Sequence, residues 1–139
     1  MKLSSKGRYA VMALADLAKF NPNEPVSLRD ISLRQGISLV YLEQLFSKLK
    51  KNQIVTSVRG NRGGYVLLKK PSEIKISEIF VAVDEKIKTI GCEEHSNRGC
   101  NGRSAKCITH DLWDELGNYI NDFFRKKNLG DLINQTKFN

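Results

Sequence analysis

The residues best suited to chemistry lie in one short stretch of the chain, from Cys92 to His110. This stretch contains all three cysteines and both histidines of the 139 residues, with the spacing Cys92-x7-Cys100-x6-Cys107-x2-His110 and the second histidine at His95. The glycines, asparagines and serines between the cysteines favour turns and open loops. The last cysteine and His110 are one helical turn apart, so both side chains can face a single ion. Thiolates and imidazole on an open loop are ligands for a thiophilic metal or an iron–sulfur cluster.

Spacing alone leaves three kinds of site open. Structural zinc sites usually carry cysteine pairs about two to four residues apart, and this stretch has none. Loops of seven and six residues suit a wider cage, such as a cluster with two irons, in which a histidine ligand raises the reduction potential. The third interpretation is a redox-sensing thiol site without a metal.

The charge of the chain is unevenly distributed. The net charge is +8, and residues 1–86 carry 15 Lys and Arg against 8 Asp and Glu, whereas residues 87–139 carry 8 against 7. A basic N-terminal part is typical of a protein with a polyanionic partner, although lysine-rich surfaces also serve solubility alone. The motifs described below, taken together with this charge, predict that the partner is double-stranded DNA.

Several classes of protein are disfavoured by what the sequence lacks. An odd number of cysteines and an N-terminus without an apolar signal core predict a cytoplasmic protein with reduced thiols. The first apolar run, from Tyr9 to Leu17, contains Asp16 and is too short for a membrane span. Paired carboxylates, a Ser/His/Asp set and a dinucleotide fingerprint are all missing, so we expect neither an enzyme nor a small-molecule substrate.

The N-terminal half has the pattern of a helix-turn-helix. Ser4 and Ser5 can cap a helix that runs to about Phe20, and Ser27 opens a short second helix that ends at Gly36. Ser38 caps a third helix. The apolar positions recur with helical spacing in the first helix (Ala10, Ala13, Leu14, Leu17) and in the third (Leu42, Leu45, Phe46, Leu49). Two short helices joined by a glycine turn are the outline of a DNA-binding motif.

The polar face of the third helix is the candidate base-reading surface. A recognition helix reads base edges in the major groove from its N-terminal end, where Gln44 can pair with adenine and Glu43 can accept from cytosine. A solvated helix face would show the same polar pattern. The candidate DNA-binding residues of this helix are Ser38, Tyr41, Glu43, Gln44 and Lys48.

A basic hairpin follows the third helix. Residues 54–58 and 65–68 read as strands, and the tip between them carries Arg59, Gly60 and Arg62. The tip does not match a nucleotide phosphate loop. Directly after a helix-turn-helix it predicts a wing, whose glycines allow close approach to a phosphate backbone and whose arginines can enter the minor groove. The alternative is a plain hairpin with arginines for solubility.

Two further helices complete the expected chain. Pro71-Ser72 begins a fourth helix with a stripe of Ile76, Ile79, Phe80 and Val83. Thr109 or a near neighbour opens a last helix to about Lys127, and residues 129–133 add a short packed turn. The apolar positions of the last helix cover more than one stripe, which favours a helix shared by two chains over a core helix in a monomer. These positions are Leu112, Trp113, Leu116, Tyr119, Ile120, Phe123 and Phe124.

The motifs together resemble the IscR-type winged-helix regulators, the iron–sulfur cluster regulator family. The resemblance runs almost end to end, through residues 3–10, Ile37-Ser38 with 41–46, Val58-Arg59-Gly60 with Gly63-Gly64-Tyr65, and 107–113. It implies that Cys92, Cys100, Cys107 and His110 ligate a [2Fe–2S] cluster, that Arg59 is the wing arginine, and that Glu43 and Gln44 read bases. The two loops between the cysteines are longer than in the best-known members, which keeps His95 as a rival ligand to His110.

The expected fold is mainly α with a small β-hairpin wing: a winged helix-turn-helix followed by a long C-terminal dimerisation helix. We expect a DNA-binding domain over residues 1–86, a Cys/His cluster-binding loop over 87–110, and a dimerisation helix with a tail over 111–139. The expected function is a homodimeric repressor or activator whose operator binding is controlled by the cluster. The resemblance implies control of cluster-assembly or related iron and stress genes. The alternatives are a constitutive DNA-binding protein with structural zinc and a cluster- or zinc-based redox protein.

Overall fold

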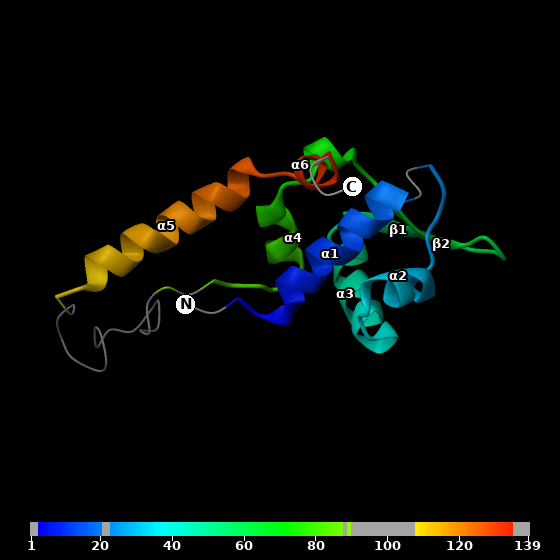
Figure 1. Cartoon of the computed structure of the whole chain (residues 1–139), viewed down its shortest axis with the longest axis horizontal. Helices are drawn as coiled ribbons and strands as arrows, with labels where there is room; N and C mark the ends of the chain where they lie inside the picture. Colours follow the sequence, from blue (N-terminus) through cyan, green and yellow to red (C-terminus); the bar gives the residue numbers. More distant parts are fainter. Residues whose placement is uncertain (1–2, 21–22, 88, 90–107, 135–139) are drawn as a thin grey trace.

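The computed structural model describes residues 3–20, 23–87, 89 and 108–134, and shows a winged-helix body from which one long helix projects (Figure 1). The elements follow the predicted order. They are α1 (Ser5–Phe20), α2 (Leu28–Gln35), α3 (Leu39–Lys51), β1 (Val55–Val58), β2 (Gly64–Leu67), the 3₁₀ turn η1 (Pro71–Glu73), α4 (Ile76–Ala82), α5 (His110–Lys126) and α6 (Leu129–Ile133).

The core of the body forms where the apolar stripes of α1 and α3 meet those of α2 and α4. All four stripe residues predicted for α1, and all four predicted for α3, are buried. Ile31 of α2 and Ile79 of α4 complete the same cluster and are fully buried. Helical periodicity therefore identified the core-facing side of the helices correctly, because one packed face is what holds a short helix in place.

The predicted caps of α2 and α3 are confirmed. The side chain of Ser27 accepts a hydrogen bond from the backbone N–H of Asp30, and Ser38 accepts one from that of Tyr41. Gly36 ends α2 with a φ of 68°, a left-handed conformation that glycine adopts without strain. Gly36 and Ser38 therefore define the turn between the two helices of the motif, and Ser27 defines the start of the first of them.

The wing is a two-stranded antiparallel hairpin with Val55 opposite Leu67 and Val58 opposite Gly64. Val26 extends it by one bridge to Tyr65, whose ring packs edge-on against Phe46 of α3 with centroids 4.9 Å apart. Gly64 has a φ of 154°, and a Cβ there would lie 2.3 Å from the carbonyl oxygen of Val26. Glycine is therefore required where the hairpin meets the segment before α2.

The helix predicted from Pro71 is divided in the structure into η1 and α4. Between them, Ile74 and Lys75 are extended and pair with the chain beyond α5. The N–H of Leu129 donates to the carbonyl of Ile74, at 2.9 Å, and the N–H of Ile76 donates to that of Lys127, at 3.0 Å. This pairing between segments distant in the sequence explains why one continuous helix does not form.

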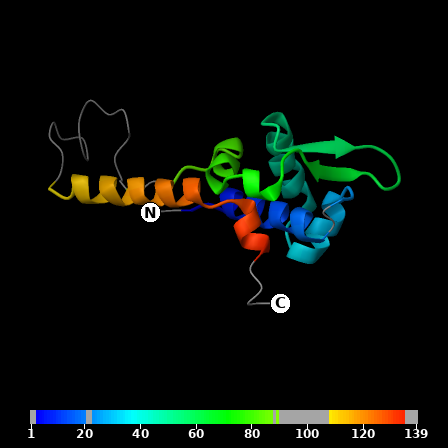
Figure 2. The same ribbon diagram turned by 90° about the horizontal axis from the view of Figure 1, so that it is seen from above.

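The last two helices differ in their surroundings. α6, the predicted packed turn, lies against α1 and η1, and its Leu129 is fully buried. α5 runs outward from α4, at the end of the molecule opposite the wing (Figure 2). Among the described residues, no helix is long and apolar enough to cross a membrane.

Candidate nucleic-acid interface

The outward face of α3 forms one wall of a shallow groove of about 600 Å³. Glu43 and Gln44 are exposed on this face, one helical turn beyond the capped N-terminus. Lys6 of α1 and Lys48 of α3 add positive charge to the groove. Side chains of this kind, at the N-terminal half of the second helix of a helix-turn-helix, can reach base edges in the major groove.

Ser38 and Tyr41, two further candidates, also position the helix. The Ser38 hydroxyl caps α3, as described above. The Tyr41 hydroxyl lies 3.0 Å from Oγ of Ser5, and its half-buried ring packs edge-on against Tyr9 with centroids 5.8 Å apart. These contacts tie the N-terminal part of α1 to the N-terminal part of α3.

The candidates in the wing lie at its tip. Arg59, Gly60 and Arg62 are all exposed, and the hairpin extends beyond the helices (Figure 2). The N–H of Gly63 donates to the carbonyl of Gly60 at 2.9 Å, and Gly60 has a φ of 118°, which glycine alone adopts readily. The wing therefore presents two guanidinium groups on a tight turn, an arrangement suited to a phosphate backbone.

A buried ion pair that the sequence analysis missed fixes α2 against α1. Asp16 is almost fully buried; it accepts two hydrogen bonds from Nε of Arg34, at 3.2 and 2.9 Å, and one from Nη2 at 2.7 Å. Gln35 donates a further bond to Asp16 at 2.8 Å. These hydrogen bonds and the charge of Asp16 raise the pKa of Arg34 above its usual value. An aspartate beside the apolar stripe of α1 was the available signal, because buried carboxylates are rarely unpaired.

Sequence reasoning did not find two more contacts of α3, both at the protein surface. Nζ of Lys50 donates to Oγ of Ser57 in β1 at 2.7 Å. Nζ of Lys48 lies 3.3 Å from Oδ2 of Asp84, which directly follows the C-cap of α4. Both bonds join α3 to other parts of the body, and neither leaves a pattern in the local sequence.

Most of the predicted cluster ligands lie outside the described residues. The structure does not describe Cys92, Cys100, Cys107 or the rival ligand His95, so the arrangement of these residues stays a prediction. His110 is described; it is the first residue of α5, directly after the N-cap Thr109. Three thiolates and an imidazole are a donor set that fits an iron–sulfur cluster, and His110 would contribute its imidazole from the start of the long helix.

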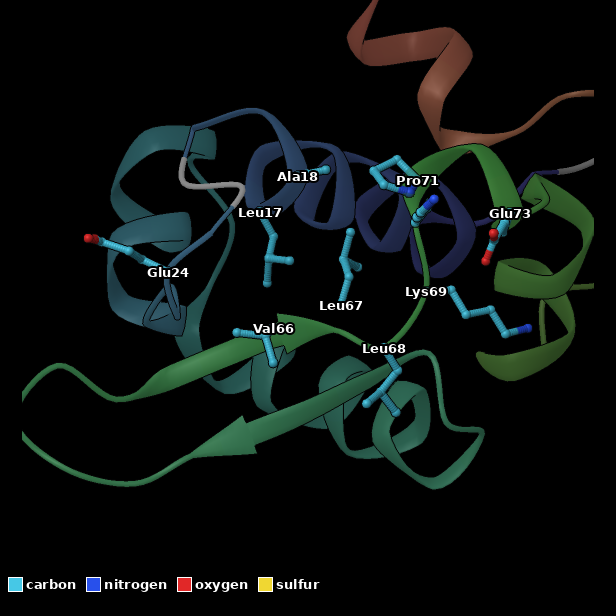
Figure 3. A pocket seen from close by; sticks show the side chains of 10 residues that line it. Leu17, Ala18, Glu24, Val66, Leu67, Leu68, Lys69, Pro71 and Glu73 are labelled. Carbon is cyan, nitrogen blue, oxygen red and sulfur yellow. The ribbon is translucent and has the colours of Figure 1, made fainter.

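A second hollow, separate from the α3 groove, lies at the foot of the wing (Figure 3). It has a volume of about 400 Å³ between the C-terminal end of α1, β2 and η1. Leu17 and Leu67 lie inside it, whereas Glu24 lies at one end and Lys69 and Glu73 at the other. Among the residues that the structure describes, no predicted site residue lines this hollow.

Comparison with known sequences gives a match over nearly the whole chain. Residues 3–135 match the Rrf2 family, described as iron-dependent transcriptional regulators. The chain is 50% identical over 134 residues to the HTH-type transcriptional regulator IscR of Photorhabdus laumondii, covering 96% of this chain and 80% of that protein. It is likewise 50% identical over 134 residues to IscR of Escherichia coli O1:K1, covering 96% of this chain and 81% of that protein.

Solved structures show the same fold. The structure of IscR from T. potens superposes with a TM-score of 0.75 and 33% identity, covering 96% of this chain and 86% of that one. CymR, the global cysteine regulator of B. subtilis, superposes with a TM-score of 0.77 and 30% identity, covering 96% of each chain. The expected mainly α fold with a β-hairpin wing and the resemblance to IscR-type regulators are both confirmed. The chain therefore belongs to the Rrf2 family of iron-dependent transcriptional regulators.

Proposed function

We propose that this chain is a transcription regulator whose operator binding is controlled by a [2Fe–2S] cluster held by Cys92, Cys100, Cys107 and His110. The observation that carries the DNA-binding part is the α3 groove, where Glu43 and Gln44 are exposed on a helix that Ser38 caps and Tyr41 anchors. Membership of the Rrf2 family, and the named IscR relatives, support the same conclusion. The chain acts by binding, not by catalysis.

On DNA, α3 lies in the major groove and the wing follows the backbone. Gln44 pairs with an adenine edge and Glu43 accepts from a cytosine amino group, so these two side chains carry base discrimination. Arg59 and Arg62 at the exposed tip of the wing contact phosphates or the minor groove. Gly60 allows the backbone to approach closely. Tyr41 and Lys48, which line the α3 groove, and Ser38, which caps the same helix, are the further contacts that we propose.

The cluster site connects two elements of different function. His110 begins α5, and the segment that carries the three cysteines joins α4 to α5. When bound, the cluster supplies an oxidation-sensitive centre that can be lost or changed. We infer that its ligands fix the segment between α4 and α5, and that this alters how the wing and Glu43 meet the operator. A coupling free energy of about 1–3 kcal/mol, typical between two sites, is sufficient.

We further propose that the regulator is a cytoplasmic homodimer joined through α5, acting as repressor or activator. The exposed apolar residues of α5 can pack against the α5 helix of a second copy. The two recognition helices of such a dimer can reach half-sites about one DNA turn apart. We expect the regulated genes to include those for cluster assembly, or for related iron and redox stress, because the named relatives are IscR proteins.

A thiol-based regulator without a cluster is the second candidate. It is favoured by the fold of CymR from Staphylococcus aureus, solved in an oxidized form, which superposes on this chain with a TM-score of 0.76 and 29% identity. A constitutive DNA-binding protein with structural zinc is the third. Visible absorption of anaerobically purified protein, with iron, sulfide and zinc analysis, separates these candidates, and we expect iron and sulfide in equal amounts with little zinc.

The test of control by the cluster compares two forms of the protein on the same operators. The cluster-loaded protein and a Cys92→Ala, Cys100→Ala, Cys107→Ala variant are titrated against one panel of DNA sites at fixed salt. We expect different rank orders of affinity in the two forms. If both forms bind every site equally, the cluster does not control DNA binding and the proposal is rejected.

A further inference from the structure

One residue joins the recognition helix to the segment that leads toward the cysteines. Asp84 lies two residues beyond the end of α4 and eight residues before Cys92. Its carboxylate pairs with Nζ of Lys48 at 3.3 Å, and its carbonyl accepts from Nζ of Lys6 at 3.3 Å. Both lysines line the α3 groove, so Asp84 holds two of the cations that face the DNA.

The backbone at Asp84 is fixed in an uncommon conformation. Its φ is 59°, in the left-handed region that few residues other than glycine, asparagine and aspartate adopt. Its N–H donates to the carbonyl of Val81 at 3.2 Å, and the next residue, Glu85, donates to Phe80 at 2.8 Å. The nearly buried Glu85 also accepts a 2.5 Å hydrogen bond from Ser4. The chain thus presents the Asp84 carboxylate to α3 from an anchored turn.

The ion pair with Lys48 is exposed and therefore exchangeable. The side chain of Lys48 is 45% exposed and that of Asp84 is 73% exposed. Exposed pairs of this kind contribute little to stability, because water and salt compete with them. A DNA phosphate is a competing anion, and Lys48 lies one helical turn beyond Gln44 on the same side of the groove.

We propose that Asp84 is a positioning residue for DNA binding: it engages Lys48 in competition with DNA phosphates, and the cysteine-containing segment sets how strongly it does so. The proposal rests on the proposed function, because the second part requires a cluster-dependent form of the protein. Three observations support the proposal. Asp84 contacts both Lys48 and Lys6, which line the α3 groove, and its turn is hydrogen-bonded to α4. Cys92 follows only eight residues later in the sequence.

The first test removes only the charge. Asparagine tolerates the left-handed conformation, so Asp84→Asn keeps the turn while freeing Lys48. We expect about two- to fivefold tighter binding to operator and random-sequence DNA alike, with a slope of log K against log salt steeper by about one. In a Lys48→Met background this gain should disappear. Asp84→Gly, which also accepts a positive φ, should give the same gain if Asp84→Asn folds poorly.

The control variant is Asp122→Asn. It removes the same charge from another exposed pair, with Arg125 at 2.9 Å, but lies on α5, away from the groove. We expect its DNA affinity to equal that of the natural protein. A gain from Asp84→Asn that persists undiminished in the Lys48→Met background, or no gain at all, overturns the proposal.

The second test measures the link to the cysteine-containing segment. The ratio of operator affinities between cluster-loaded and cluster-free protein is measured for the natural chain, Asp84→Asn and Asp122→Asn. We expect the ratio to move toward one in Asp84→Asn alone. An unchanged ratio in Asp84→Asn, while the natural chain still distinguishes its two forms, overturns the link and leaves the proposed function standing. Equal affinities of the two forms of the natural chain would instead reject the proposed function.

Discussion

The winged-helix body and α5 differ in how far their apolar residues are buried. α1 buries seven of its sixteen residues, whereas α5 buries none of its seventeen. Within the part of the chain that the structure describes, Phe124 is the residue of α5 that packs against the core, with its ring centroid 4.7 Å from that of Phe80. The exposed large apolar residues of α5 are Leu112, Trp113, Leu116, Tyr119 and Phe123.

The difference shows that apolar content does not by itself decide burial. The stripes of the body face other elements of the same chain, so the body closes around one core. α5 projects beyond that core and has no buried residue (Figure 1). This arrangement agrees with the expectation that one small domain cannot bury both apolar stripes of the last helix. Large exposed apolar surfaces are uncommon on monomeric proteins, and a helical one suits a second copy of itself.

The largest expected effect is loss of assembly through α5. Replacing Leu112 and Tyr119 with aspartate places charges on its exposed apolar side, where burial of an unpaired carboxylate costs several kcal/mol. We expect monomers in sedimentation, poor binding to a palindromic site, and a thermal unfolding midpoint of the body close to that of the natural chain.

The matched control for assembly is Asn118→Asp, which adds a charge to the opposite, polar side of the same helix. This variant should sediment like the natural protein. If the natural protein is itself monomeric at micromolar concentration, α5 is not a dimer interface and its apolar side requires another explanation.

A smaller effect is expected from breaking the ion pair that orders the body. Asp16→Ala leaves Arg34 without its partner, and we expect a loss of about 2–3 kcal/mol in the free energy of unfolding. The estimate is at the low end for buried pairs, because the Arg34 side chain is 32% exposed and can regain water. Denaturant titration measures the change.

The pH dependence of this pair follows from Arg34. Because the pKa of Arg34 is raised, the stabilisation that the ion pair gives is fully present below the ordinary pKa of arginine and is lost only at more alkaline pH. The loss of stability in Asp16→Ala should therefore be constant between about pH 6 and 9.

On α5, Asp122→Ala breaks an exposed pair and should change the free energy of unfolding by less than about 0.5 kcal/mol. Equal losses in the two variants would contradict the contrast between body and α5.

The remaining predictions concern the proposed DNA contacts, all of which lie on the body. Gln44→Ala should cost about 1–3 kcal/mol at one or two base positions and relax specificity there. Arg59→Ala should weaken all DNA sites similarly and reduce the salt slope by about one. Binding measured against single-base operator variants at several salt concentrations distinguishes the two. A uniform loss from Gln44→Ala would argue against base reading, and neither variant should change sedimentation.

Local patterns predicted much of the fold because their causes are local. The caps Ser27 and Ser38, the left-handed Gly36 and the stripes of α1 and α3 each depend on residues within a few positions of one another. The single helix expected from Pro71 was wrong in its start, because extended pairing between residues 74–75 and 127–129 interrupts it. No pattern near Pro71 reveals that partner.

The sequence by itself determined the fold class and the basic character of residues 1–86, because helical period and composition express these directly. The donor set at Cys92, Cys100, Cys107 and His110 and the reading pair on α3 are predictions that the resemblance to a known family implies. Tertiary structure alone decided that Asp16 meets Arg34, that Asp84 holds Lys48 and Lys6, and that α6 returns to α1. The residues of each contact lie at least 18 positions apart in the sequence, and only packing of the whole chain brings such residues together.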